Sequence, residues 1–205
     1  MFTVRAIVFL IFVLVFASCS RFSGYAPKAG DIVFQDLDTP QGQALKLATG
    51  STYTHCGLVF ENNGDFIVYD AVGPVRMINL QEWIRNGVNG HVVAKRLDTL
   101  RQDLTEQTLG QMRELAERHL GKDYDLVFDW TDDQMYCSEL VWKVYSQGMG
   151  LELVPLRPMG SYRLDHPIVK AQLRERYGDS IPMEQPVVAP SDLFDSELLQ
   201  LVYKN

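Results

Sequence analysis

Tyr136-Cys137-Ser138-Glu139-Leu140-Val141-Trp142-Lys143-Val144-Tyr145 places a cysteine at the start of an amphipathic segment. Apolar side chains recur in this segment at helical spacing, and the polar residues 131–134 before it are typical of a loop. We therefore predict a helix over residues 137–147, with Cys137 in its first turn. A thiol at that position faces unpaired backbone N–H groups and the positive end of the helix dipole, which favour the thiolate. Cys137 is thus the candidate nucleophile, although a free cysteine is also a common core residue.

The composition is that of an ordinary globular protein. Of the 205 residues, 46% are hydrophobic and 22% are charged. A chain of this length forms one domain with a core of its own, without the need for disulfide bonds. The formal net charge of −7 argues against nucleic acid as a partner and indicates no particular ligand.

Residues 1–18 have the pattern of a secretory signal peptide. A single basic residue, Arg5, precedes an unbroken apolar run over residues 6–16, and small residues follow it. This run is too short for a comfortable membrane span. We expect the signal peptide to be removed, residues 19–28 to form a short tether, and residues 29–205 to form the domain.

Two cleavage sites compete at the end of this signal. Phe16-Ala17-Ser18-Cys19 resembles the lipobox of bacterial lipoproteins, although Phe16 replaces the usual leucine. This resemblance implies that Cys19 carries the lipid, and Ser20 after it implies an outer-membrane lipoprotein on the periplasmic side of the cell envelope. The alternative is cleavage after Ala17, which would give a soluble periplasmic protein.

The order of the predicted elements indicates an α+β fold. Two apolar runs flank Asn63-Gly64, the dipeptide that a tight hairpin turn requires, so they are predicted to be paired antiparallel strands. Other strands and helices surround this hairpin, with strands grouped in the middle of the chain. The predicted strands cover residues 31–35, 54–60, 66–72, 91–97 and 187–188, and the predicted helices cover 40–48, 80–85, 105–120, 137–147 and 166–177.

A cysteine nucleophile needs a base, and His55 is the histidine whose position fits this role. If the hairpin pairs residues whose numbers sum to 127, His55 faces Val72 and lies diagonally next to Asp70. An acidic residue there can orient the imidazole, although a slip of one residue in the register would turn it away. The simpler interpretation is a strand-end histidine and carboxylate with no role in catalysis.

The remaining cysteine allows a structural alternative. Exported cysteines are often paired, so a Cys56–Cys137 disulfide would compete with catalysis. Side chains alternate along a strand, so Cys56 is predicted to point away from His55 and to pack in the core. No pair of histidines or cysteines has the spacing of metal ligands, so we predict no metal and no cofactor.

Three stretches together resemble the permuted papain-like amidases of the YaeF/YiiX kind. They are Thr54-His55-Cys56-Gly57, Gly121-Lys122-Asp123-Tyr124-Asp125 and Tyr136-Cys137-Ser138-Glu139-Leu140-Val141. Their order is that of an NlpC-type papain-like domain in circular permutation, because the histidine strand precedes the nucleophile helix. The resemblance implies a central antiparallel sheet packed against that helix, and extends more distantly to lecithin:retinol acyltransferase.

The same resemblance implies a catalytic set. Cys137 would be the nucleophile, His55 the base and Asp70 the orienting acid, with Tyr136 or Tyr53 near the cleft as an oxyanion donor. It implies hydrolysis of an amide bond, and the predicted location suggests cell-wall peptide as the substrate. Two alternatives stay open: a thiol acyltransferase or lipid deacylase, which would need an apolar groove, and a non-catalytic binding module of the envelope.

Overall fold

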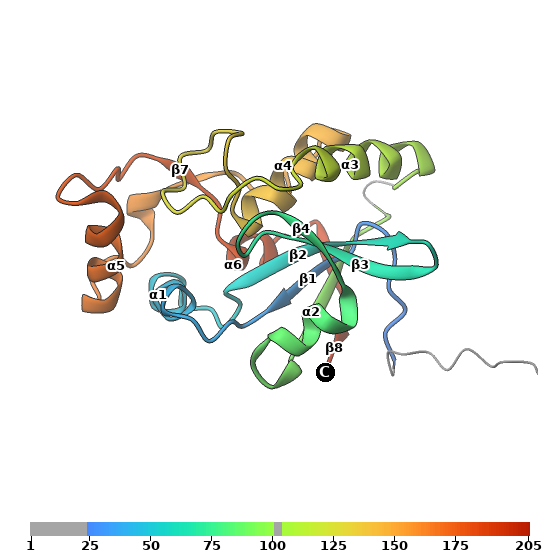
Figure 1. Ribbon diagram of the computed structural model, residues 1–205, viewed down its shortest axis with the longest axis horizontal. Helices are drawn as coiled ribbons and strands as arrows, with labels where there is room; N and C mark the ends of the chain where they lie inside the picture. Colours follow the sequence, from blue (N-terminus) through green and yellow to red (C-terminus); the bar gives the residue numbers. More distant parts are fainter. Residues whose placement is uncertain (1–23, 101–103) are drawn as a thin grey trace, which may run out of the picture.

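The computed structural model describes residues 24–100 and 104–205 (Figure 1). The predicted signal peptide and Cys19 lie outside the described residues. Within the described part, none of the helices combines the length and the apolar character needed to cross a bilayer.

A six-stranded antiparallel sheet forms the centre of the molecule (Figure 1). Its strand order is β4-β3-β2-β1-β5-β8, so the predicted hairpin of β2 and β3 lies beside β1 near the middle. This arrangement confirms the predicted α+β class with a central antiparallel sheet. The strands are β1 (Ile32–Gln35), β2 (His55–Asn62), β3 (Asp65–Asp70), β4 (Arg76–Asn79), β5 (Val93–Leu97) and β8 (Leu199–Lys204).

Helices cover both faces of the sheet. Helix α4 packs against β2 with α3 beside it, while α2 lies on the opposite face (Figure 1). Helices α1 and α5 contact each other at one end of the sheet. The helices are α1 (Pro40–Thr49), α2 (Leu80–Asn86), α3 (Glu106–Arg118), α4 (Cys137–Met149), α5 (Pro167–Tyr177) and α6 (Pro190–Phe194), and a small second sheet pairs β6 (Arg157–Pro158) with β7 (Pro186–Val187).

The hairpin has the predicted register. Leu58 pairs with Tyr69 and Val59 with Val68, so the numbers of paired residues sum to 127. Alternate side chains of β2 pack into two hydrophobic clusters, one on each face of the sheet. Leu58 and Phe60 pack with the buried face of α4, while Val59 packs with Trp83 of α2 on the other side.

Gly57 lets the two sides of the hairpin approach closely. A Cβ atom at this position would lie 2.3 Å from Val68 Cγ1 and 3.5 Å from the indole nitrogen of Trp83. Only a residue without a side chain fits there. The glycine therefore allows Val68 of β3 to pack closely against β2. Trp83 lies beside them, and its indole stacks on the ring of His55, the first residue of β2, with centroids 5.6 Å apart.

Three features differ from the predictions. Strands β4 and β8 were not expected, and both lie at the edges of the sheet, where pairing with a neighbour stabilises short and half-exposed segments. The end of the predicted tether belongs to the folded body. Tyr25 is buried, stacks on Tyr203 and donates a hydrogen bond to Asp31 over 2.8 Å.

Candidate active site

The structure places Cys137 at the first position of α4, as predicted. The residue before it, Tyr136, caps the helix, and its backbone N–H donates to Glu139 Oε2 over 3.2 Å. Because first-turn N–H groups have no partner within a helix, those near the sulfur of Cys137 can stabilise negative charge. Cys137 is only 3% exposed, so this charge is shielded from water.

His55 and Asp70 form a buried pair at the end of the hairpin. His55 Nε2 lies 2.6 Å from Asp70 Oδ1, so the short aspartate side chain does reach the imidazole. Asp70 also accepts hydrogen bonds from Trp83 Nε1 and Arg76 Nε, each over 3.0 Å. Burial alone would raise the pKa of Asp70, but the hydrogen bond and charge of His55, with the Trp83 and Arg76 donors, lower it. The carboxylate is thus ionised and held in one orientation.

The nitrogen of His55 that does not face Asp70 is available to Cys137, and the two side chains are hydrogen-bonded. Burial would lower the pKa of His55, but the negative charge of Cys137 and the bonds to Asp70 and Cys137 raise it to about 10. The pKa of Cys137 lies well below the usual range for a thiol. These opposite shifts describe a thiolate–imidazolium pair.

Cys56 lies where it was predicted, but its interaction with Cys137 was not expected. It does lie on the face of β2 opposite to His55, in the core against α4. However, α4 packs against β2, and Cys137 interacts with both His55 and Cys56. The hydrogen bond from the Cys56 thiol is the largest cause of the lowered pKa of Cys137, and the Cys56 backbone N–H adds to it. Both cysteines are free thiols in this structure, so the disulfide alternative is not what it shows.

Two cavities meet at this site. The first, called here the apolar cavity, contains Cys137 and has an almost entirely apolar surface. The second, called the histidine-side cavity, is wider, contains His55 and exposes more polar groups. Gln41, Leu45, Tyr124, Gln172 and Arg176 form the wall that the two cavities share. The apolar cavity is lined mainly by Ala44, Leu45, Phe128, Met159, Val169 and Val188.

Tyr124 is a site residue for which no role was predicted. It lines both cavities, and its hydroxyl oxygen accepts a hydrogen bond from Gln41 Nε2 over 2.6 Å. Burial and then the negative charge of Cys137 raise its pKa well above the usual value. Tyr124 therefore keeps its proton and can donate it as a hydrogen bond near the sulfur. The stretch Gly121-Lys122-Asp123-Tyr124-Asp125 carried the family resemblance, but it gave no indication of where this side chain points.

The two tyrosines suggested as oxyanion donors are placed differently. The ring of Tyr53 stacks on Phe194 with centroids 4.1 Å apart, and Tyr53 lines neither cavity. Its segment precedes β2, so the alternation that orients His55 does not extend to it. Tyr136 lines the apolar cavity beside Cys137, and its hydroxyl accepts a hydrogen bond from the backbone N–H of Val188 over 3.3 Å. Tyr136 thus forms part of the wall.

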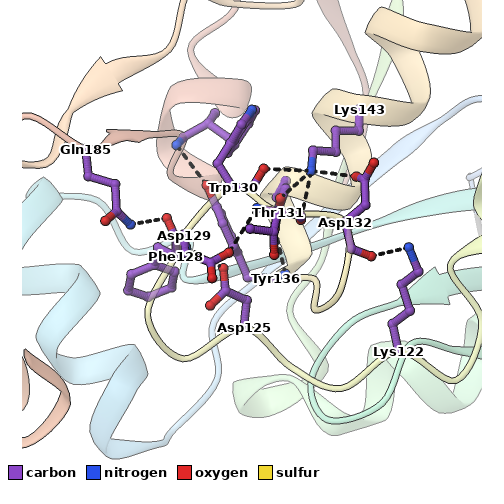
Figure 2. Close-up of polar contacts among 12 residues, drawn as sticks. Lys122, Asp125, Phe128, Asp129, Trp130, Thr131, Asp132, Tyr136, Lys143 and Gln185 are labelled. Carbon is purple, nitrogen blue, oxygen red and sulfur yellow. Dashed lines mark hydrogen bonds and ion pairs between the residues drawn. The ribbon is translucent and has the colours of Figure 1, made fainter.

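A loop over residues 121–136 carries Tyr124 to the site. Polar contacts among other residues of the loop and its neighbours fix its path (Figure 2). Buried Asp125 accepts hydrogen bonds from the backbone N–H groups of Val127 and Asp129, each over 2.8 Å. Lys143 of α4 contacts Asp132 Oδ1 over 2.9 Å and the carbonyl oxygen of Thr131 over 3.1 Å. The loop is thereby attached to the helix that carries Cys137.

Comparisons with known proteins identify the family of this chain. A family model described as "Permuted papain-like amidase enzyme, YaeF/YiiX, C92 family" matches residues 26–203. The uncharacterized protein YiiX of Escherichia coli K12 is 39% identical over 180 residues, which cover 88% of each chain. A crystal structure described as that of "metalloprotein yiiX", from Escherichia coli O157:H7, superposes with a TM-score of 0.84 and covers 88% of this chain and 99% of its own. This chain therefore belongs to the YaeF/YiiX family of permuted papain-like amidases, a family of cysteine amidases and peptidases.

Proposed function

We propose that this protein hydrolyses an amide bond with Cys137 as nucleophile, His55 as acid and base, and Asp70 as the orienting carboxylate. The observation that carries the proposal is the continuous chain of contacts from Cys137 to His55 and from His55 to Asp70. The Cys137 thiolate attacks the carbonyl carbon, and imidazolium His55 then gives its proton to the leaving amine. Water, deprotonated by His55, resolves the thioester and releases the acid.

Two groups can stabilise the oxyanion of this reaction. The backbone N–H of Cys137 lies in the first turn of α4, where intrahelical partners are lacking. The hydroxyl of Tyr124 keeps its proton because its pKa is raised. Since Gln41 donates a hydrogen bond to the hydroxyl oxygen, the O–H group of Tyr124 can act as the donor to the oxyanion. Hydrogen bonds of this kind strengthen as charge develops on the carbonyl oxygen.

The apolar cavity favours a second candidate function. The sulfur of Cys137 opens onto a surface formed almost entirely by carbon atoms, and such a surface suits an aliphatic acyl group better than a cell-wall peptide. A lipid deacylase or thiol acyltransferase would use the same residues on an acyl ester or acyl amide. The predicted location in the cell envelope is compatible with either substrate.

The related protein from Escherichia coli O157:H7 is described as a metalloprotein. In residues 24–100 and 104–205 of this chain, no three histidine, cysteine, aspartate or glutamate side chains are grouped as metal ligands. His55 Nε2 is also engaged by Asp70. These residues do not fit a metal site, and the proposed reaction has no metal-dependent step.

The test compares the reduced wild-type protein with Cys137→Ser, using N-octanoyl amides and cell-wall peptides as two substrate sets. We expect the wild type to hydrolyse an amide and to accumulate a thioester visible by mass spectrometry, while Cys137→Ser loses both with its circular dichroism unchanged. Cleavage of the octanoyl set alone would identify the acyl-directed function. A fully active Cys137→Ser protein would refute the proposed nucleophile.

A further inference from the structure

The division of the site into two cavities assigns each half of the substrate to one side. Cys137 opens onto the apolar cavity, whereas His55 opens onto the histidine-side cavity. In the proposed reaction the acyl group becomes attached to Cys137 and the leaving amine receives its proton from His55. The acyl group therefore belongs in the apolar cavity, and the leaving amine belongs in the histidine-side cavity.

The wall of the histidine-side cavity contains an arginine, Arg176, that forms no ion pair within the described part of the chain. Arg176 lies in the last turn of α5. Its Nη2 donates to Gln41 Oε1 over 3.0 Å, and its guanidinium lies over the Phe128 ring, 5.2 Å from the centroid. Glu175 also lines this cavity and contributes a negative charge, but its carboxylate is exposed, is not paired with Arg176 and accepts a hydrogen bond from Gln172 over 3.5 Å.

Arg176 has N–H donors left for a ligand in the histidine-side cavity. A guanidinium has five N–H donors, and the bond to Gln41 uses one of them. Arg176 lines both cavities, yet the surface of the apolar cavity contains almost no polar atoms. Its polar atoms therefore contribute little to the apolar cavity, whereas the more polar histidine-side cavity, where the leaving amine is expected, also contains Arg176. A planar guanidinium in this position suits a carboxylate, which it can bind through two parallel hydrogen bonds.

We propose that the leaving group is an amino acid with a free α-carboxylate, which Arg176 binds, so that the substrate class is N-acyl amino acids with an apolar acyl group. This inference rests on the proposed function. The C–N bond of the amide breaks as the Cys137 thioester forms, and His55 supplies the proton that makes the amine a leaving group. Water then cleaves the thioester, so the products are a carboxylic acid and the free amino acid.

The test compares two substrates that differ only in charge, N-octanoyl-glycine and N-octanoyl-glycinamide. We expect wild-type kcat/KM to be about 10- to 100-fold higher for the carboxylate, the range of a charge-assisted hydrogen bond. Arg176→Gln should remove most of this preference, and Arg176→Lys should keep part of it. Arg174→Gln is the matched control, because Arg174 lies on the same helix, is exposed and lines neither cavity. The Arg174→Gln variant should therefore prefer the carboxylate substrate as strongly as the wild type does.

Two results would overturn the inference and leave the proposed function standing. The first is a wild-type protein that hydrolyses both substrates equally well, a result that needs no variant and does not depend on how Arg176→Gln folds. The second is an equal loss on both substrates in Arg176→Gln, which would show that Arg176 acts only through Gln41 on Tyr124. If wild type cleaves no amide of any kind and forms no thioester, the proposed function itself fails.

Discussion

The charge of one sulfur atom controls the chemistry of this site. Three donors converge on Cys137: the Cys56 thiol, the His55 imidazolium and the backbone N–H of Cys56. Burial and the nearby Cys137 raise the pKa of Cys56 well above its usual value, so Cys56 keeps its proton while Cys137 loses its own. The two thiols are therefore chemically distinct although they are in contact.

This arrangement predicts an unusual pH dependence for alkylation of Cys137. Because its pKa is lowered, the thiolate is present at neutral pH and is lost only as the pH falls through that lowered value. In His55→Ala, the alkylation midpoint should move up towards the ordinary cysteine value of about 8.5. Iodoacetamide rates between pH 4 and 10, read by peptide mass spectrometry, distinguish Cys137 from Cys56. A wild-type midpoint near 8.5 would contradict the ion pair.

The same pair predicts where hydrolysis stops at high pH. The pKa of His55 is raised to about 10, so the imidazolium that protonates the leaving amine is present below that pH and is lost above it. The rate of thioester formation should therefore stay high from neutral pH to about pH 9 and decline through about pH 10. Single-turnover measurements on N-octanoyl-glycine would show this decline, whereas a loss centred near pH 6.5 would mean that His55 has an ordinary pKa.

Tyr124→Phe should lower kcat for N-octanoyl-glycine about 10- to 1,000-fold with little change in KM, because it removes a donor that acts mainly on the transition state. Tyr69→Phe is a suitable control, since the Tyr69 hydroxyl is bonded to Glu117 and lines neither cavity. A Tyr124→Phe enzyme with wild-type kcat would leave the backbone of Cys137 as the main oxyanion donor.

The contrast between Asp70 and Tyr124 shows which site residues a sequence can predict. The pairing of His55 with Asp70 follows from the Asn63-Gly64 turn, because a two-residue turn fixes the register of the whole hairpin. Tyr124 reaches Cys137 through a loop without regular structure, and contacts with distant residues such as Gln185 and Lys143 set its path. Neither periodicity nor alternation describes such contacts.

At the scale of elements, α4 positions both Cys137, the proposed nucleophile, and the loop over residues 121–136. Lys143 lies between them and is 4% exposed. Its Nζ atom is 2.7 Å from Glu139 Oε1 in the first turn of α4, and it also binds Asp132 and the carbonyl oxygen of Thr131 (Figure 2). Loop and helix thus share one buried cation. The helix itself was predictable from its apolar spacing, but β4 and β8 were not, because pairing with neighbouring strands stabilises them.

Lys143→Met should destabilise the protein by about 3 kcal/mol, because it leaves Glu139 buried without its partner. Burial raises the pKa of Glu139 to about 7 even with Lys143 present. A carboxyl whose pKa is higher in the folded state destabilises the fold as the pH rises above its unfolded value. The difference in the free energy of unfolding between wild type and Lys143→Met should therefore be larger at pH 9 than at pH 6, as measured by urea unfolding.

The double variant Glu139→Gln/Lys143→Met separates charge from loop contacts. The glutamine side chain introduced in place of Glu139 carries no charge to bury, so this protein should regain part of the lost stability and lose most of the pH dependence. Its loop would still lack the bonds from Lys143 to Thr131 and Asp132, so activity should remain below that of wild type. A double variant as unstable as Lys143→Met would show that the buried charge is not the cause.

For the whole molecule, the question is how the folded body relates to a membrane. The body starts by Tyr25, whose stacking on Tyr203 attaches the N-terminal segment to β8. Cys19 precedes Gly24 by five residues, a length that spans at most about 18 Å. If Cys19 carries a lipid, the body stays close to the bilayer surface, where substrates with apolar acyl groups are concentrated.

This relation makes the lipidation hypothesis testable with the intact chain. We expect the wild-type protein, expressed with its signal in a Gram-negative host, to fractionate with the outer membrane and to begin at a Cys19 that carries lipid mass. Cys19→Ala should be released to the periplasm in soluble form, while hydrolysis of a soluble substrate such as N-octanoyl-glycine stays at the wild-type level, because Cys19 is far in sequence from every residue of the site. Cys56→Ala is the matched control for fractionation alone, since it removes another cysteine without altering the lipobox, whereas the loss of a donor to Cys137 should lower its activity. A mature chain that begins at Ser18 would instead establish cleavage after Ala17. In that case no lipid on Cys19 would anchor the protein, and its access to substrate would not depend on attachment to the membrane.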